Sequence, residues 1–156
     1  MNWKKIKPFL FSILIAVGVG ALSGFLTKDA MPAYESLPKS NLTPPSIVFP
    51  IVWTILFVLM GISAAIIFRS DSPDRKKCLW LYGIQLAVNF LWSIFFFNLQ
   101  WFLFSFLWLF LLWLLILATI WNFWEISQTA ALLLFPYLIW VSFAGYLNFV
   151  IWILNR

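Results

Sequence analysis

Five apolar runs follow one another along the chain, and each is long enough to cross a lipid bilayer. They fall at about 8–26, 46–68, 78–97, 101–121 and 130–153, with nearly all charged residues between them. An α-helix rises about 1.5 Å per residue, so roughly 20 apolar residues span the hydrocarbon core. The pattern predicts an all-α membrane protein, a five-transmembrane-helix bundle that forms a single transmembrane domain over residues 1–156.

Composition supports the membrane as the solvent of this chain. Of its 156 residues, 64% are hydrophobic and 10% are charged. A soluble domain with this balance would expose large apolar patches to water, whereas lipid accepts apolar surface. The first run follows Lys4, Lys5 and Lys7, as a signal peptide would. It is longer than a typical signal core and no small-residue cleavage pattern closes it, so we expect a retained helix.

The connections between the runs differ greatly in length. Residues 27–45 form the long one, and four prolines within it predict a stiff, irregular segment that could act as a lid over the bundle: Pro32, Pro38, Pro44 and Pro45. The connection at 98–100 is so short that the third and fourth helices are expected to be antiparallel neighbours.

The basic residues divide unequally between the two ends of the predicted bundle. Seven lie on the N-terminal side (Lys4, Lys5, Lys7, Arg69, Arg75, Lys76 and Lys77) and three on the other (Lys28, Lys39 and Arg156). Because cytoplasmic loops carry the excess of Lys and Arg, we expect a cytoplasmic N-terminus, with the C-terminus and the 27–45 loop outside.

Several kinds of chemistry lack the residues that they need. The predicted spans hold no Asp, Glu, Lys or Arg at mid-depth, which argues against proton relays, ion-coupled transport and small multidrug antiporters. The chain has no histidine and a single cysteine, Cys78, so no metal site and no cofactor are expected.

Neutral polar and aromatic side chains instead share helix faces. Gln85, Asn89 and Trp92 fall on one face of the third helix, Trp140, Ala144 and Asn148 on one face of the fifth, and Trp53, Phe57 and Met60 on one face of the second. The amides could simply be hydrogen-bonding glue between helices, and tryptophans often anchor membrane surfaces. Alternatively, these faces enclose a flat aromatic pocket beneath the 27–45 loop.

Small residues repeat every four positions in two helices. Ala16, Gly20 and Gly24 do so in the first helix, and Gly83 and Ala87 in the third. Such stripes let helix backbones approach closely. They indicate either packing within one chain or, for Gly83 and Ala87, a homodimer interface.

Three stretches together resemble one family. They are Pro44-Pro45-x-x-x-Phe49-x-x-x-Trp53 with Met60-Gly61, then Gln85-x-x-x-Asn89-x-x-Trp92-Ser93, and finally Pro136-Tyr137-x-x-Trp140-x-x-Phe143-Ala144-x-x-Leu147-Asn148. The chain is similar over nearly its whole length to the tryptophan-rich sensory protein or translocator protein family, as a bacterial member.

The resemblance implies a five-helix bundle, often a homodimer, in a bacterial cell membrane, with a porphyrin and drug site under the first loop. Bacterial members are associated with tetrapyrrole binding and with light- and oxygen-dependent breakdown of protoporphyrin. Carried over residue by residue, the ligand-binding pocket falls on Tyr34, Trp53, Asn89, Trp92, Trp140, Ala144 and Asn148, with Pro44 and Pro45 at its rim. The sterol motif of animal members is absent, because Val150 and Ile153 stand at its tyrosine and arginine positions.

Three classes of function remain open. The first is a receptor or sensor that binds protoporphyrin IX, haem-type tetrapyrroles and hydrophobic drug-like ligands. The second is an unusual enzyme that degrades porphyrin by photo-oxidation, in which Trp53 and Trp140 exchange electrons with the excited pigment, without acid–base or metal catalysis. The third is a passive transporter of tetrapyrroles or other hydrophobic ligands.

Overall fold

The computed structural model describes residues 2–156 as an all-helical bundle. Its elements are α1 (Trp3–Thr27), the short 3-10 helix η1 (Lys28–Ala30), α2 (Met31–Ser36), α3 (Val48–Phe68), α4 (Arg75–Ser93), the π-helical turn η2 (Ile94–Asn98), α5 (Phe102–Trp124), α6 (Gln128–Leu132) and α7 (Phe135–Leu154). Five of the helical stretches are long and apolar enough to cross a membrane, which confirms the predicted fold class.

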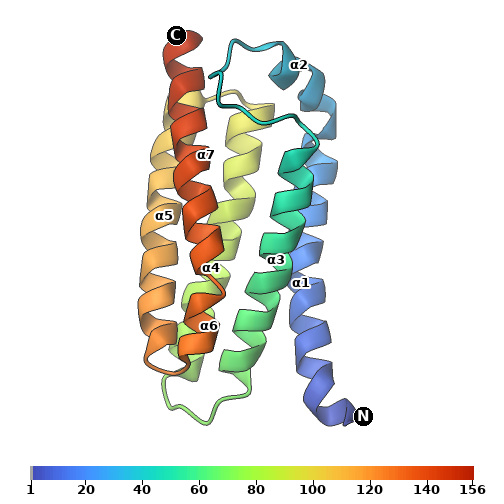
Figure 1. Ribbon diagram of the computed structural model, residues 1–156, viewed down its shortest axis with the longest axis vertical. Coiled ribbons are helices and arrows are strands. Elements are labelled where there is room, and N and C mark those ends of the chain that lie inside the picture. The colour runs from blue at the N-terminus through green and yellow to red at the C-terminus, as the bar shows by residue number, and fades with distance from the viewer. Residues whose placement is uncertain (1) are drawn as a thin grey trace.

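The long helices run roughly side by side, and the two termini lie at opposite ends of the bundle (Figure 1). Helix α1 packs mainly on α3, while α5 packs against both α4 and α7. The packing of α5 on α4 confirms that the helices on either side of the short 98–100 connection are neighbours. Within that connection Gln100 has a φ of 53°, the left-handed conformation that a tight turn requires.

Two helices begin earlier than the apolar runs. Helix α1 starts at Trp3 and α4 at Arg75, so Lys4, Lys5 and Lys7 are helical, as are Lys76 and Lys77. Long basic side chains keep their charge in water while their stems lie along an apolar helix, so hydropathy alone underestimates helix length.

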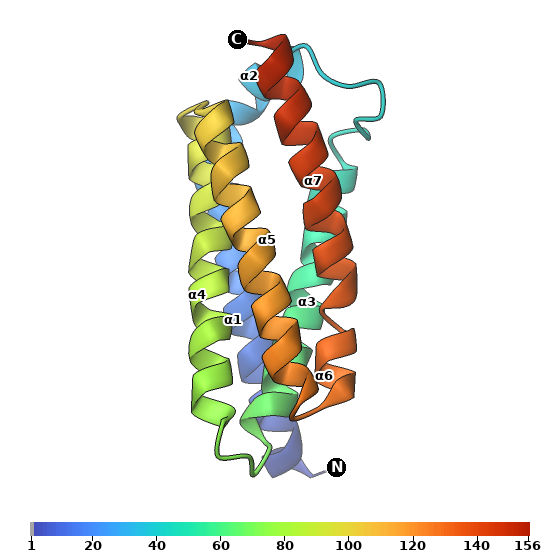
Figure 2. The same ribbon diagram turned by 90° about the vertical axis from the view of Figure 1, so that its left-hand side faces the viewer.

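The 27–45 segment corrects the prediction of an irregular loop. Helix α1 continues to Thr27, η1 and α2 follow, and only residues 37–47 lack regular helix. Pro32 lies in the first turn of α2, where a missing N–H breaks no helical hydrogen bond. Helix α2 lies across the end of the bundle that also holds the C-terminus (Figures 1 and 2).

The last span is broken rather than continuous. Pro136 lies in the first turn of α7, and the chain turns at Leu133 and Leu134 between α6 and α7. The Leu134 N–H bonds the Ala131 carbonyl, which leaves the Ala130 carbonyl without its usual helical partner. The Ser63 hydroxyl of α3 donates to that carbonyl at 2.6 Å, so α3 supplies the hydrogen bond that the break removes.

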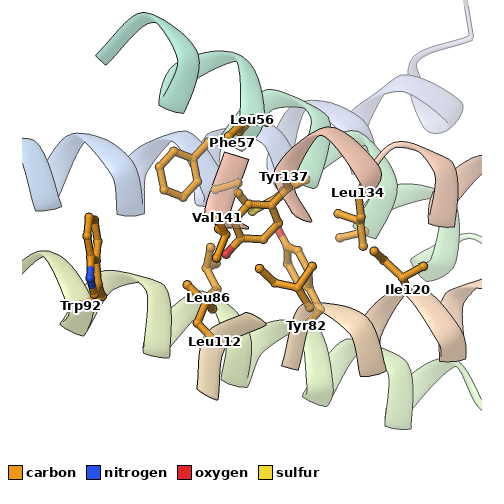
Figure 3. Close-up of a cluster of buried hydrophobic side chains, with 14 of the residues drawn as sticks. Leu56, Phe57, Tyr82, Leu86, Trp92, Leu112, Ile120, Leu134, Tyr137 and Val141 are labelled. Carbon is orange, nitrogen blue, oxygen red and sulfur yellow. The ribbon is translucent and has the colours of Figure 1, made fainter. Parts of the chain in front are cut away.

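The interior between the helices is filled by large apolar side chains (Figure 3). Tyr137, Met60 and Phe123 are fully buried there. Figure 3 shows Trp92 at some distance from Tyr82 and Tyr137, further along α4, although all three belong to the same buried cluster. The packed core thus extends along α4 as far as its aromatic face.

Gly61 lets α1 and α3 approach closely. A Cβ atom at this position would lie 2.5 Å from the Ile13 Cα, which belongs to backbone and cannot rotate away. We expect Gly61→Ala to destabilise the protein by about 1–3 kcal/mol, as overpacking does. Unfolding in mixed detergent micelles measures the loss. Gly18→Ala, whose Cβ would meet nothing within 4 Å, is the matched control, and an equal effect of both substitutions would contradict the close contact.

Candidate functional site

One large cavity lies beneath α2, in the half of the bundle that holds the C-terminus. Its volume is about 580 Å³, within the range typical of small-molecule sites. Helices α1, α2, α3, α4 and α7 all contribute to its wall, together with η2 and the two residues before α3, Ser46 and Ile47. The lining is mostly apolar and aromatic.

The structure brings seven of the predicted pocket residues together on this cavity. They are Tyr34, Trp53, Asn89, Trp92, Trp140, Ala144 and Asn148. Pro44 and Pro45 are not among the lining residues; the cavity wall begins one residue later, at Ser46. The prolines therefore direct the chain into α3 beside the site rather than contacting its interior.

Tyr34 closes the cavity from α2. Its ring centroid lies 5.3 Å from that of Phe97, 6.0 Å from that of Phe96 and 6.2 Å from that of Phe49. These rings come from η2 and α3, so the lid is held to two walls by aromatic contacts, each typically worth about 0.5–1.5 kcal/mol beyond its buried area. The loop after α2 is also tied to α7, through Ser40 with Tyr146 at 3.0 Å and Asn155 with the Pro38 carbonyl at 3.2 Å.

Two walls of the cavity are lined by indole rings. Trp53 of α3 and Trp92 of α4 lie 6.4 Å apart between centroids, and Trp92 stacks on Phe96 at 5.3 Å. Trp140 of α7 lies 5.8 Å from Phe49 of α3, one turn before Trp53. The site thus presents broad aromatic faces rather than a set of charges.

The polar side chains around the cavity are largely engaged with one another. The Trp92 indole N–H donates to Asn148 Oδ1 at 3.1 Å, and Asn148 Nδ2 donates to the Phe102 carbonyl at 2.8 Å. Asn89 Nδ2 donates to the Tyr137 hydroxyl at 2.7 Å, which in turn donates to Gln85 Oε1 at 2.8 Å. Asn148 therefore acts as interhelical glue even though it lines the cavity, and Gln85 lies outside the cavity wall.

Lys39, in the segment that follows α2, does not offer a free cation to a ligand. Its ammonium donates to the carbonyls of Tyr34, Glu35 and Leu37 at 2.9–3.1 Å. The side chain caps the end of α2, as cations often do at helix C-termini. The ionisable carboxylate on the cavity wall is that of Glu35.

Sequence reasoning missed the contribution of α1 and η2. Val17, Ser23 and Gly24 of α1 line the cavity, as do Phe96 and Phe97 of η2. The stripe of Ala16, Gly20 and Gly24 held a signal for this. A Cβ at Gly20 would lie 2.5 Å from the Phe57 ring, whereas one at Gly24 would meet nothing within 4 Å. The stripe therefore packs against α3 at one end and opens onto the cavity at the other.

This arrangement can bind a flat apolar molecule against its aromatic walls and contact the polar edges of that molecule.

Comparison with known proteins identifies the family of this chain. Residues 11–153 match the family model described as the TspO/MBR family. The Tryptophan-rich protein TspO of Chlorobaculum tepidum is 41% identical over 155 residues, covering 97% of this chain and 98% of that protein. The Tryptophan-rich sensory protein of Cereibacter sphaeroides is 34% identical, covering 96% and 90%, and the human Translocator protein is 30% identical, covering 91% and 86%. The chain therefore belongs to the TspO/MBR family of multi-pass membrane proteins.

Proposed function

We propose that this protein is a membrane receptor or sensor that binds porphyrins, such as protoporphyrin IX and haem-type tetrapyrroles, and hydrophobic drug-like molecules in the cavity beneath α2. The observation that carries the proposal is a cavity of about 580 Å³ walled by Trp53, Trp92 and Trp140. Indole faces stack on flat rings, and a neutral wall avoids placing charge in lipid.

The names of the relatives fit more than one function for such a cavity. "Sensory protein" describes the relative in Cereibacter sphaeroides, and "Translocator protein" describes the human relative. Light- and oxygen-dependent degradation of a bound porphyrin at Trp53 and Trp140 is the second candidate function, favoured by the presence of both indoles on the cavity wall. Passive transport of tetrapyrroles is the alternative.

One experiment separates these functions. Purified protein in nanodiscs is titrated with protoporphyrin in the dark, and the bound sample is then illuminated in air while its absorbance is followed. Saturable binding without pigment loss supports a receptor, and light-driven loss beyond that of pigment in empty nanodiscs supports degradation. Saturable flux into proteoliposomes would support transport instead, and absence of saturable binding would contradict all three.

A bound porphyrin is expected to keep its propionates near the outer mouth, where water lowers the cost of desolvation. Because Lys39 already caps α2 and Glu35 lies on the wall there, the mouth offers these anions solvent rather than a committed cation. Ligands with fewer negative charges should therefore bind at least as well as protoporphyrin.

The orientation in the membrane is the first prediction about the whole protein. The basic residues lie at opposite ends of the bundle in the expected ratio of seven to three, which predicts that the 69–77 segment is cytoplasmic and the 27–45 segment outside. In a Cys78→Ala background, an impermeant thiol reagent should label Ser36→Cys but not Asp74→Cys in intact cells. Both positions are exposed, so the reverse labelling pattern would mean that the topology is inverted.

Assembly is the second such prediction. Gly83 and Ala87 are exposed on α4, and a Cβ at Gly83 would meet nothing within 4 Å, so this pair does not pack within the described chain. We propose that it forms a homodimer interface, where Gly83→Ile would push two backbones apart. Crosslinking in lipid should show loss of dimer while the monomer keeps its fold. A dimer content unchanged by Gly83→Ile would place the interface elsewhere.

A further inference from the structure

A buried hydrogen-bonded chain leads from the cavity into the core of the bundle. Asn89 of α4 lines the cavity and donates through Nδ2 to the hydroxyl of Tyr137 on α7, at 2.7 Å. The Tyr137 hydroxyl in turn donates a hydrogen bond to Gln85 Oε1, at 2.8 Å. Neither Tyr137 nor Gln85 lines the cavity, and both are 1% exposed. Of these three hydrogen-bonded side chains, only Asn89 can contact a ligand in the cavity.

The amide of Asn89 has one atom left for a ligand. Its Nδ2 is committed to Tyr137, whereas its Oδ1 accepts no hydrogen bond from residues 2–156 and is not among their fully buried unpartnered atoms. Because Asn89 as a residue is only 3% exposed and lines the cavity, this oxygen faces into it. In this arrangement the cavity offers a hydrogen-bond acceptor.

At the Gln85 end of this hydrogen-bonded series, one donor group has no acceptor. Gln85 Nε2 is fully buried and has no hydrogen-bond acceptor among residues 2–156. A buried N–H without a partner is rare and costly, and a carbonyl without one is tolerated somewhat better. The hydroxyl of Tyr82, one turn earlier on α4, is also buried without a partner in the described structure, so it offers Gln85 no direct bond.

The same three side chains can make the same two hydrogen bonds in the opposite sense. A primary amide carries an acceptor and a donor of nearly identical shape, and a phenol donates one bond while accepting another. If both amides turn over, Gln85 Nε2 donates to Tyr137 and Tyr137 donates to Asn89 Oδ1. One N–H of Gln85 then gains an acceptor in exchange for the bond that Gln85 Oε1 gives up, and Asn89 turns its NH₂ group to the cavity.

We propose that Gln85 and Tyr137 form a reversible relay that lets Asn89 present either its carbonyl or its NH₂ group to a bound ligand. The inference rests on the proposed function of the cavity and adds the class of ligand that it accepts. These ligands are flat aromatic molecules that present either a hydrogen-bond donor or an acceptor to Asn89. Gln85 and Tyr137 are positioning residues, because they act on the ligand only through Asn89.

Three tricyclic probes of nearly the same shape test the relay. Carbazole has a ring N–H donor, dibenzofuran has a ring oxygen acceptor, and fluorene has neither. Each is titrated into the wild-type protein in nanodiscs, with empty nanodiscs as the reference for lipid partitioning, and tryptophan fluorescence is followed. We expect both polar probes to bind about 3- to 10-fold more tightly than fluorene, the gain typical of one hydrogen bond.

Removing Gln85 should make the relay one-sided. In Gln85→Leu the Tyr137 hydroxyl keeps a single acceptor, Asn89 Oδ1, so the NH₂ group of Asn89 is fixed toward the cavity. Dibenzofuran should keep its advantage over fluorene, and carbazole should lose most of its own. Gln85→Met, which preserves more of the side-chain length, should shift the ratio in the same direction if the leucine variant folds poorly.

Leu86→Ala is the matched control. Leu86 is buried beside Gln85 and does not line the cavity, so its truncation loosens the same region without altering the relay. The ratio of the carbazole and dibenzofuran affinities should stay at its wild-type value in this variant, whatever happens to stability. A merely structural role for Gln85 would leave that ratio unchanged in Gln85→Leu as well.

The remaining outcomes overturn the proposal. If the wild-type protein prefers only one polar probe, the two hydrogen bonds have a fixed direction. If all three probes bind equally, Asn89 makes no hydrogen bond with the ligand. Fluorene binding in that last case would still support the aromatic cavity. Absence of binding by all three probes and by protoporphyrin would overturn the proposed function, and the relay with it.

Discussion

Replacing two indoles of the cavity wall, Trp53 and Trp140, with alanine should weaken protoporphyrin binding by about 30- to 1000-fold. The two side chains come from different helices, α3 and α7, and each Trp→Ala substitution removes both a stacking contact and a large apolar area. A loss of about 1–2 kcal/mol for each ring gives an effect of this size. Fluorescence titration of Trp53→Ala/Trp140→Ala in nanodiscs measures it.

The matched control removes two tryptophans from the lipid-facing surface. Trp80 and Trp121 are 73% and 74% exposed, and neither lines the cavity. Trp80→Ala/Trp121→Ala leaves the same number of tryptophans for the fluorescence signal and should bind protoporphyrin with nearly unchanged affinity. If the folded cavity variant binds as tightly as this control, the ligand lies elsewhere and the proposed site is wrong.

The helices and the aromatic wall were predictable because both depend on spacing along single helices. Apolar runs of about 20 residues specify spans in lipid, and positions four apart fall on one face. Trp140, Ala144 and Asn148 therefore reach the same cavity, as do Asn89 and Trp92 on α4. Neighbouring helices needed only to be brought together for these faces to form a common wall.

Features that depend on contacts between distant elements could not be predicted in this way. The prolines of the 27–45 segment indicated irregular structure, yet α2 forms because Pro32 lies in its first turn and the ring of Tyr34 packs against Phe49 and Phe97. The break before α7 had a local signal in Pro136. Its stabilisation by Ser63 of α3 had none, since the two positions are 67 residues apart from donor to acceptor.

For the polar groups of the site, too, the helix face was predictable and the contacts were not. Gln85 and Asn89 were visible as amides four residues apart on one helix face, with cavity lining and glue as open alternatives. The structure gives each residue a different position, because Tyr137 lies between them and joins α4 to α7. Tyr137 carries no signal of its own beyond the Pro136-Tyr137 pair, because the direction of its buried hydroxyl depends on the break between α6 and α7 that orients the helix.

Replacing the same two indoles with phenylalanine should separate binding from photochemistry. Trp53→Phe/Trp140→Phe keeps an aromatic face on each wall, so the affinity for protoporphyrin should fall by about tenfold or less. Phenylalanine is far harder to oxidise than tryptophan. If indole electron transfer drives degradation, the light-dependent loss of pigment should therefore fall to the rate of protoporphyrin in empty nanodiscs.

The single substitutions should not be equivalent in this experiment. Trp53 lies 6.4 Å from Trp92 and 6.2 Å from Tyr137 between ring centroids, so an oxidised Trp53 has oxidisable neighbours to which the electron deficiency can move. The aromatic contacts of Trp140 are with Phe49 and Phe143, which are poor electron donors. We expect Trp53→Phe to slow pigment loss more than Trp140→Phe, measured by absorbance under constant illumination at saturating protein. Trp80→Phe/Trp121→Phe serves as the control and should degrade pigment at the wild-type rate. If the folded double variant of the cavity also does so while still binding pigment, the indoles take no part in the reaction, and the excited porphyrin reacts with oxygen by itself.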